Sequence, residues 1–288
     1  MPWIDWCLTS LSNSSVKTTV VIVDNCSIDG TREHIPSVYP EVVWMPQEHN
    51  LGFGQGNNLG IRYALENDAD YILLLNQDAA IEKDALQFML RASDGESLVT
   101  PLMFNRDGTQ FDKMFGYTLR SVSVDLLASL LINNILPEKM FKGETCAACW
   151  LMPISLIKKV GGFNPLFFQY GEDNNYFQRM RYYKVNNILA PNAKMFHDRM
   201  IVGNMTTYKK NMLRRDIILI ACDINLSVLK CIFKIFRLLV QCYIYGLPQR
   251  RYKIGMFTNE LLWILLHLRS IISSRSKEKK PGLCWLQE

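Results

Sequence analysis

The sequence predicts an α/β fold in which a mostly parallel sheet is flanked by helices and followed by a C-terminal helical tail. Three observations support this prediction. Between residues 19 and 197, short β-branched and apolar runs alternate with segments of helical periodicity, an order typical of sheets covered by helices. Acidic and amide residues directly follow several of these runs. The composition then changes to long apolar stretches with regularly spaced cations.

The change of composition divides the chain into an α/β domain at residues 1–205 and a basic amphipathic tail at residues 206–288. With 49% hydrophobic and 20% charged residues, the 288-residue chain is neither disordered nor collagen-like. Residues 199–288 contain 16 Lys and Arg but only 5 Asp and Glu, whereas residues 1–198 are acidic. We therefore expect the tail to meet an anionic surface or partner.

The first half of the α/β domain has the clearest pattern. Buried strands are expected at Thr19–Val23, Val42–Met45, Tyr71–Leu75 and Leu98–Pro101, and helices at Asn57–Asn67 and Ala79–Ala92. Asp24 and Asp78 each follow one of these strands. Because ligands of such sheets bind at the carboxyl ends of the strands, both aspartates are expected at one binding edge.

The second half of this domain is less regular. Residues 104–145 combine a polar loop with an expected helix at Val122–Leu131, which we interpret as a flexible or acceptor-facing insertion. The remaining pattern predicts strands at Ala147–Met152, Asn187–Ala190 and Ala193–His197, and helices at Ser155–Val160 and Glu172–Tyr183.

The tail is largely apolar over residues 217–245, which is long enough to suggest a membrane span. However, polar residues recur at steps of four and three, which places Lys230, Lys234 and Arg237 on one stripe of a helix. A spanning helix rarely carries three cations through its middle. With a second apolar helix at Thr258–Ile272, residues 217–280 are predicted to lie on an anionic membrane surface or against protein, a homodimer included, and not on nucleic acid.

The eight cysteines favour a reducing compartment. Only Cys146 and Cys149 form a C-x-x-C pair, and the sequence offers no second pair to complete a zinc site. We interpret them as small residues beside a buried strand. Without a basic and apolar leader, the chain is expected in the cytoplasm, at the inner face of the plasma membrane if the tail binds lipid.

Four segments carry the functional signal, and they occur in a fixed order. They are VIVDNCSIDGT from residue 21, NLGFGQGNNLGI from residue 50, LLLNQDA from residue 73, and GGFNPLFFQYGEDNNYFQR from residue 161, followed by His197. Together they resemble the inverting family 2 glycosyltransferases of GT-A fold, especially the rhamnosyltransferase-like branch, over residues 3–215. The resemblance implies transfer of a sugar from a dTDP- or UDP-sugar to a glycan or lipid-linked acceptor in cell-surface polysaccharide synthesis. Resemblance to the rhamnosyltransferase-like branch suggests that this sugar is rhamnose.

The resemblance also assigns the chemistry residue by residue. Asp78 and His197 match metal ligands, and Mn²⁺ or Mg²⁺ would offset the charge that develops on the departing diphosphate. Asn76 stands where many relatives have an aspartate, which removes one charge. In the pair Glu172–Asp173, Asp173 is the expected base for the acceptor's proton. The structural alternatives are a helix N-cap for Asp78, a hydrogen-bonded core histidine for His197, and helix-starting acids for the pair.

The remaining matches concern the nucleotide-sugar. Asp24 is expected to contact the base or ribose, and Arg179 to brace the acidic pair or contact phosphate. Asn76 is also expected to bind the nucleotide-sugar. Glycine lets a backbone approach phosphate closely, so a loop containing Asn50, Gly52, Gly54 and Asn58 is expected to close over the nucleotide. A dinucleotide-binding fingerprint is rejected, because Asn57 breaks the G-x-G-x-x-G spacing.

The segment WIDWCLTSL at residues 3–11 normally follows an apolar strand in the family. That first strand is expected to be missing here, either because the true start lies upstream of Met1 or because the product is a fragment. The alternative function is therefore a non-catalytic remnant or a module that binds nucleotide or glycan. A nucleotidyltransferase ranks third, since no basic glycine-rich loop follows the first visible strand.

Overall fold

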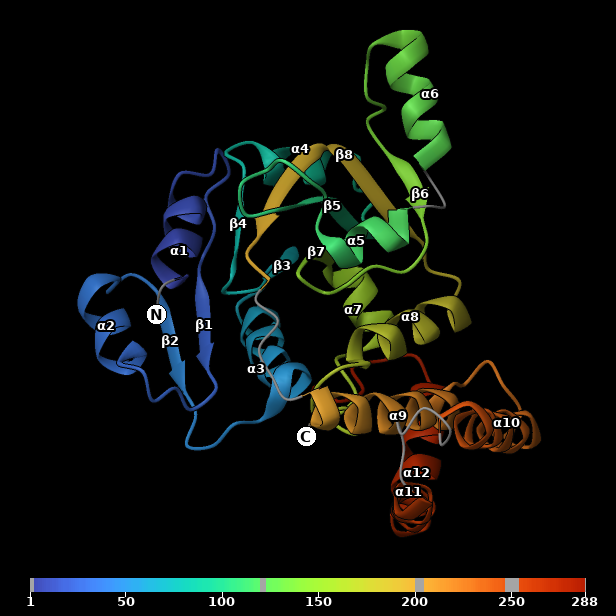
Figure 1. Ribbon diagram of the computed structural model, residues 1–288. Helices are drawn as coiled ribbons and strands as arrows, with labels where there is room; N and C mark the ends of the chain where they lie inside the picture. The colour runs from blue at the N-terminus through green and yellow to red at the C-terminus, as the bar shows by residue number, and fades with distance from the viewer. Residues whose placement is uncertain (1–2, 120–122, 200–204, 247–253, 288) are drawn as a thin grey trace.

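The computed structural model describes residues 3–119, 123–199, 205–246 and 254–287. A central β-sheet has helices on both faces, and helices from the last part of the chain form a further layer at one end of the molecule (Figure 1). The predicted α/β class, with flanking helices and a helical tail, is confirmed.

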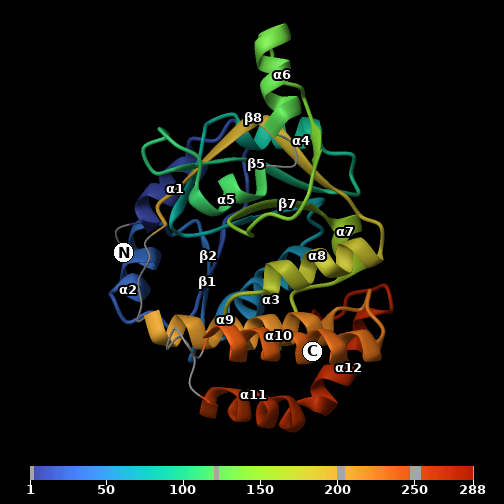
Figure 2. The same ribbon diagram turned by 45° about the vertical axis from the view of Figure 1, so that its right-hand side comes forward.

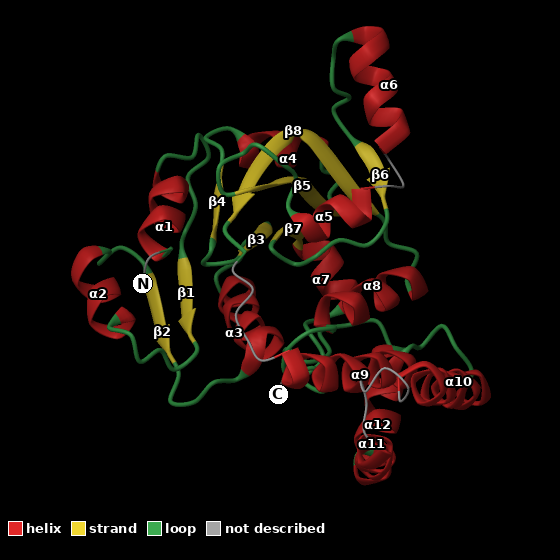
Figure 3. Cartoon of the chain, in the orientation of Figure 1, coloured by secondary structure: helices red, strands yellow, loops and turns green. Residues whose placement is uncertain are grey.

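The central sheet has six strands in the order β3-β7-β5-β8-β4, with β6 also paired to β8 (Figure 3). Their bounds are β3 Tyr71–Leu75, β4 Ala79–Ile81, β5 Leu98–Asn105, β6 Met140–Lys142, β7 Cys149–Pro153 and β8 Asn187–His197. Within this sheet, β5 and β8 run parallel, whereas the β3–β7, β5–β7, β4–β8 and β6–β8 pairs are antiparallel. The prediction of a mostly parallel sheet is therefore wrong.

Two further strands form a separate parallel sheet. They are β1, Val21–Asp24, and β2, Val43–Pro46, connected by helix α2, Thr31–Val38. Helix α1, Ile4–Ser12, packs its buried face against this sheet in a cluster with α2, and it also contacts β4. Asp24 thus ends a strand of the small sheet, whereas Asp78 lies between β3 and β4 of the central sheet, contrary to the expectation of one sheet.

Alternate residues of β7 point into two hydrophobic cores, as the period of a strand requires. Cys149 and Leu151 face the core that contains helix α4, Ala85–Ala92. Trp150 and Met152 face the other core. Helices α3, Gly52–Glu66, α7, Ile154–Val160, and α8, Glu172–Tyr182, cover that second side.

Two helix boundaries differ from the prediction. Residues Ala79–Ile81, expected to begin a helix, form β4 because they pair with Met195–His197 of β8. This tertiary pairing outweighs the helix propensity of Ala79 and Ala80. Helix α3 begins at Gly52 instead of Asn57, so the glycines expected in a loop form its first turns.

Strand β8 unites two predicted strands and contains an irregularity. Pro101 of β5 pairs with Ala190, but the next residue, Leu102, pairs with Lys194. Three residues of β8, Pro191–Ala193, are therefore extra relative to β5, which is the arrangement of a β-bulge enlarged to three residues. The parallel register then continues to Asn105 opposite His197.

Residues 104–145 contain helix α5, Lys113–Thr118, which was not predicted, and helix α6, Ser123–Asn133. Helix α6 projects from the body of the molecule (Figures 1 and 2) and exposes Leu131 and Ile132. The predicted helix at Val122–Leu131 is confirmed except for Val122, which lies outside the described residues.

The described part of the tail contains four helices: α9 Met205–Cys222, α10 Val228–Gly246, α11 Ile254–Leu266 and α12 Leu268–Glu278 (Figure 2). The helices expected at residues 217–245 and 258–272 are each divided in two. After α12 the chain returns to the α/β domain, where Leu286 joins the core beside Trp150. None of the helices in the described ranges combines the length and apolar character needed to cross a bilayer.

Candidate active site

Asp78 and His197 are brought together by the antiparallel pairing of β4 with β8. Ala79 pairs with His197 in this ladder, so Asp78, the residue before β4, lies beside the histidine. Oδ1 of Asp78 is 3.1 Å from Nε2 of His197. The Asp78 side chain is partly exposed, whereas that of His197 is buried. Two residues 119 positions apart thus place a buried imidazole against a partly exposed carboxylate.

The other ring nitrogen of His197 faces Asp112, with Nδ1 3.4 Å from Oδ2. Asp112 also caps α5, since its Oδ1 accepts hydrogen bonds from the backbone N–H groups of Met114 and Phe115. Arg199 donates from Nε to Oδ2 of Asp112 at 3.1 Å. The histidine is therefore held between two carboxylates, one of them fixed by a helix N-terminus.

The pKa values of this group reflect its pairing. Burial opposes ionisation of Asp112, but hydrogen bonds from His197 and from the N–H of Phe115, together with Arg199, hold its pKa well below the usual range. For His197, burial disfavours the charged imidazolium and so lowers the pKa. The hydrogen bonds to Asp112 and Asp78 more than offset this effect, and the pKa of His197 is raised.

A divalent ion fits Asp78 and His197. Mn²⁺ and Mg²⁺ prefer oxygen ligands, and Mn²⁺ also accepts imidazole nitrogen. Metal-bound histidines commonly bond a carboxylate through their second ring nitrogen, which is the relation of His197 to Asp112. Among the described residues, no group of three or more His, Cys, Asp or Glu side chains is arranged to hold a metal ion by itself.

The acidic pair Glu172–Asp173 begins α8, directly after Gly171, whose φ is 97°. Glu172 is buried, and its Oε2 has no hydrogen-bond partner among the described residues. Burial and the neighbouring charge of Asp173 raise the pKa of Glu172 to about 7. Asp173 is partly exposed, and burial of its carboxyl group raises its pKa as well. A carboxylate with a raised pKa and access to solvent can accept a proton.

The segment Cys146–Ala148 connects the two acidic groups. The backbone N–H of Ala147 lies near the carboxylate of Asp173 and acts to lower its pKa. The carbonyl of Ala148 accepts from the N–H of Asn76, which follows β3, at 3.0 Å. Arg199 donates to Sγ of Cys146 at 3.6 Å. One short stretch of chain thus lies against Asp173 on one side and against the end of β3 on the other.

Asp24 and Asn25 lie at the end of β1, where the first glycines of α3 approach. The buried Asp24 accepts hydrogen bonds from the N–H of Ser27 and from Nε of Arg32. Asn25 accepts from the N–H of Leu51 and donates to the carbonyl of Gly52. The exposed Asn50 accepts from the N–H of Gly52 at 2.8 Å. This corner is thereby joined into one hydrogen-bonded unit.

Gly52 connects this corner to the segment that precedes the acidic pair. Its φ is +80°, and a Cβ at this position would lie 2.2 Å from the carbonyl oxygen of Phe168. The N–H of Phe53 donates to the same oxygen. No side chain larger than hydrogen fits at residue 52 without a shift of the backbone.

Gly54, Asn58 and Arg179, three of the residues expected to bind the nucleotide-sugar, pack against the turn that follows α7. A Cβ on Gly54 would be 2.9 Å from Cβ of Phe163. Asn58 bonds both the carbonyl and the N–H of Phe163. The fully buried Arg179 donates to the carbonyls of Val160 and Gly162. These residues fasten α3 and α8 to the turn after α7.

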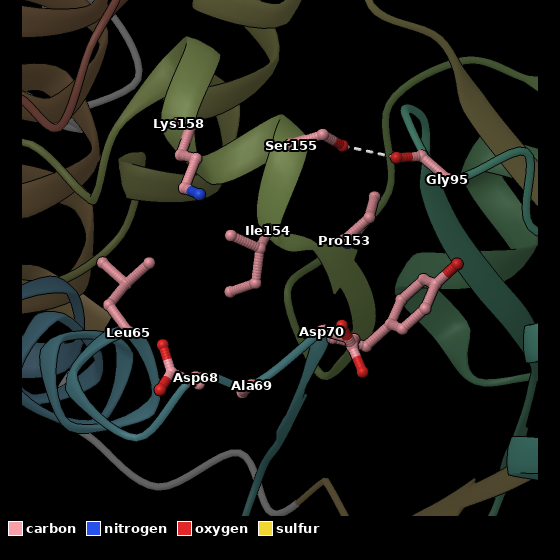
Figure 4. Close-up of a pocket in the computed structure, with 10 residues that line it drawn as sticks. Leu65, Asp68, Ala69, Asp70, Gly95, Pro153, Ile154, Ser155 and Lys158 are labelled. Atoms are coloured by element: carbon pink, nitrogen blue, oxygen red, sulfur yellow. Dashed lines mark hydrogen bonds between the residues drawn. The ribbon is translucent and has the colours of Figure 1, made fainter.

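A hollow of about 640 Å³ lies at the opposite end of β3 from Asp78 (Figure 4). Its wall includes Asp68, Asp70 and Lys158, and Tyr71, the first residue of β3, also borders it. It contains none of the residues that the sequence assigns to the site.

Comparison with known proteins identifies the family. The sequence pattern described as "Glycosyl transferase family 2" matches residues 2–151, which is more than half of the chain. The chain belongs to glycosyl transferase family 2. The predicted family is thereby confirmed.

Two curated relatives are similar over much of this chain. The low-salt glycan biosynthesis hexosyltransferase Agl10 of Haloferax volcanii is 26% identical over 172 residues, which cover 58% of this chain and 54% of that protein. The N-acetylglucosaminyl-diphospho-decaprenol L-rhamnosyltransferase of Mycobacterium tuberculosis is 24% identical over 220 residues, 68% of this chain and 72% of that protein. The match thus spans about half the length of the Haloferax protein.

Solved structures of low identity share the fold. S. aureus TarS 1-349 has a TM-score of 0.54 at 14% identity and covers 96% of this chain and 86% of its own. GalNAc-T7 with UDP, GalNAc and Mn²⁺ has a TM-score of 0.53 at 12% identity, over 74% and 44% of the two chains. The chain therefore has a GT-A-type α/β fold with a mixed sheet.

Four residues of the candidate site were not foreseen from the sequence: Asn25, Arg32, Asp112 and Arg199. Asn25 directly follows Asp24 and could have been included with it. Asp112 lies in the irregular region 104–145, where no periodicity or motif distinguishes it from other loop aspartates.

Proposed function

We propose that this family 2 chain is an inverting transferase that moves a sugar, with rhamnose favoured, from a nucleotide-diphospho-sugar to a glycan or lipid-linked acceptor of a cell-surface polysaccharide. The Mycobacterium relative is a rhamnosyltransferase whose name gives a diphospho-decaprenol-linked sugar, and the Haloferax relative is a glycan biosynthesis hexosyltransferase. Their names support the reaction class and leave dTDP- and UDP-sugars as the donors to compare.

One observation supports the proposal most strongly: the convergence of Asp78 and His197 near the segment that also touches Asp173. A divalent ion, Mn²⁺ or Mg²⁺, held by Asp78 and His197 would supply positive charge for the departing nucleoside diphosphate. Asp112 keeps the imidazole oriented toward Asp78.

Asp173 is proposed as the general base. As a residue, Asp173 is partly exposed at the first turn of α8, and the raised pKa of its carboxyl group increases its proton affinity. Glu172 is buried behind it, and its raised pKa keeps much of that side chain neutral near pH 7. A neutral Glu172 leaves Asp173 as the negative charge of the pair.

The donor is proposed to lie between the Asp24–Asn25 corner, Asn50–Gly52 and Asn76. These groups offer hydrogen bonds to a nucleoside and close backbone approach to phosphate. For Gly54, Asn58 and Arg179 we propose a supporting role instead of donor contact, since all three pack against the turn Val160–Phe163.

The test uses the whole chain with Mn²⁺ and a panel of dTDP- and UDP-sugars, including dTDP-rhamnose. Asp173→Asn is expected to lower donor turnover by about 10²- to 10⁴-fold while donor binding, followed by thermal shift, is unchanged. Asp68→Asn, an exposed aspartate beside the distant hollow, is the matched control.

Two outcomes would change the proposal. Full turnover by Asp173→Asn would exclude this residue as the base. Nucleotide binding by the unmodified chain without sugar release from any donor would favour the alternative, a module that binds nucleotide or glycan without catalysis.

A further inference from the structure

Helix α10 presents a row of large apolar side chains to solvent. Leu229, Ile232, Phe233 and Phe236 are each between 60% and 79% exposed. Their spacing of three and four residues places them on one face of the helix. Side chains of this size usually avoid water, and contiguous exposure of several marks a contact surface.

The opposite face of α10 is already occupied. Cys231 is buried, and Ile235 packs into a cluster with Ile218 of α9 and Ile271 of α12. Arg275 of α12 fixes the turn that leads into α10 by donating to the carbonyls of Ala221, Asp223 and Leu226. The apolar row is therefore held outward by packing on the inner side.

Cations lie along one flank of this apolar row. Lys230, Lys234 and Arg237 are exposed and recur at steps of four and three, so they share one stripe. On an ideal helix this stripe lies about 100° from the row. Residues 228–246 contain no aspartate or glutamate. The outer side of α10 thus combines an apolar strip with a positive edge.

Helix α11 adds a second apolar face to the same end of the molecule (Figures 1 and 2). Leu261, Leu262, Leu265 and Leu266 are exposed. Glu260, the one acidic residue of α11, is fully buried and receives two hydrogen bonds from Arg214 of α9. No negative charge from α11 therefore opposes contact with an anionic surface.

We propose that the outer face of α10 lies in the headgroup region of an anionic lipid bilayer, with its apolar side chains inserted and its cations on lipid phosphates. An in-plane helix with an apolar face and flanking cations has the character of an interfacial helix. The aliphatic stems of lysine and arginine can pack on apolar surface while their charges reach the headgroups.

The charge pattern favours lipid over a second copy of this chain. A two-fold interface centred on α10 would place the same apolar rows together and bring two sets of Lys230, Lys234 and Arg237 into proximity. The repulsion would have no acidic residue of α10 to offset it. An anionic bilayer matches both the apolar row and the positive flank.

Flotation of the full chain with vesicles tests this proposal without reference to transferase activity. We expect binding to phosphatidylcholine vesicles that contain phosphatidylglycerol, weaker binding to phosphatidylcholine alone, and loss of binding as salt increases. Replacing Lys230, Lys234 and Arg237 by Gln is expected to weaken binding to the anionic vesicles roughly 100-fold.

A second variant tests the apolar row. Phe233→Ser/Phe236→Ser is expected to lower binding to both kinds of vesicle. Leu131→Ser/Ile132→Ser, on the projecting helix α6, removes two equally exposed apolar side chains elsewhere and is expected to leave binding unchanged. Lys139→Gln/Lys158→Gln/Lys159→Gln is the matched charge control, since these lysines are exposed outside the tail.

Thermal unfolding of every variant establishes that the fold is retained, and light scattering reports the oligomeric state. Binding that is insensitive to both α10 variants would overturn the proposal. The same holds if vesicles fail to bind while the chain dimerises and the α10 variants are monomeric, since α10 would then contact protein.

Discussion

Arg179 and Glu278 face each other in the interior where α8 meets α12, with Nε of the arginine 3.5 Å from Oε1 of the glutamate. Both side chains are completely buried. Asn164 donates to Oε1 of Glu278 at 2.8 Å, and the hydroxyl of Tyr183 donates to its backbone carbonyl. The end of the tail is thus joined to the α/β domain through a buried charge pair.

Removal of one member of this pair should be strongly destabilising. Arg179→Met leaves the Glu278 carboxylate buried without its cation, and we expect a loss of about 3–5 kcal/mol in the free energy of unfolding. Denaturant unfolding measures the change. The double variant Arg179→Met/Glu278→Met should recover much of the loss, because no isolated charge remains. Additive losses would show that the two side chains act independently.

Glu172 should make stability depend on pH. Burial, and then the charge of Asp173, raise its pKa from the ordinary 4.5 to about 7. The native state therefore keeps a proton that the unfolded chain has released, so the free energy of unfolding falls as pH rises through this window, by up to roughly 3 kcal/mol. Urea midpoints at about pH 5 and about pH 8 measure the slope.

Glu172→Gln removes the titrating group at nearly constant shape. We expect this variant to lose less stability than the unmodified chain between the two pH values, and to be the more stable of the two at about pH 8. Glu66→Gln, an exposed glutamate of α3, is the control and should keep the original slope. An unchanged slope in Glu172→Gln would contradict the assignment.

Asp112→Asn should weaken metal binding without unfolding α5. The asparagine oxygen can still cap Met114 and Phe115, but the negative charge that faces Nδ1 of His197 is lost. We expect Mn²⁺ affinity, titrated by electron paramagnetic resonance, to fall about 10- to 100-fold. Asp94→Asn is the matched control, since Asp94 accepts from Glu96 and Ser97 N–H groups outside the site. Equal Mn²⁺ affinity in both variants would exclude the orienting role.

Gly52→Ala should destabilise the donor corner. The left-handed φ and the close carbonyl of Phe168 both oppose a methyl group, so we expect a loss of at least about 1 kcal/mol in stability and a higher KM for the donor. Gly60→Ala, later in the same helix, meets its nearest atom at 3.8 Å and should be neutral or stabilising. Thermal unfolding and donor titration compare the two; similar effects would contradict the strain at residue 52.

Local pattern predicted those elements whose signal lies within one segment. The strand at Tyr71–Leu75 and the helix that begins at Glu172 were placed correctly because apolar runs and first-turn acids are local features. Ala79–Ile81 was wrongly assigned to a helix. Its pairing with β8 connects residues more than a hundred positions apart, and a local pattern cannot reveal such a pairing. The mixed strand directions likewise arise because β7 and β8 pair with strands that lie much earlier in the chain.

The candidate site shows a similar limit. The family motifs led to Asp78 and His197, which the fold places 3.1 Å apart, but no motif indicated Asp112 on the far side of the ring. The glycine-rich segment 52–58 was interpreted as a loop because glycine is common in loops. In the structure its glycines permit close packing against Phe163 and Phe168 at the start of α3.

The three extra residues Pro191–Ala193 of β8 set a strict length requirement for the chain ahead of His197. Successive residues of a strand face opposite sides, so an insertion or deletion here that shifted the pairing of Lys194–His197 by one residue would turn the imidazole away from Asp78. Substitutions that preserve the count leave that orientation intact. In descendants of this gene, point changes at 191–193 should therefore be tolerated far more often than indels, although none of the three residues forms part of the Asp78–His197–Asp112 group.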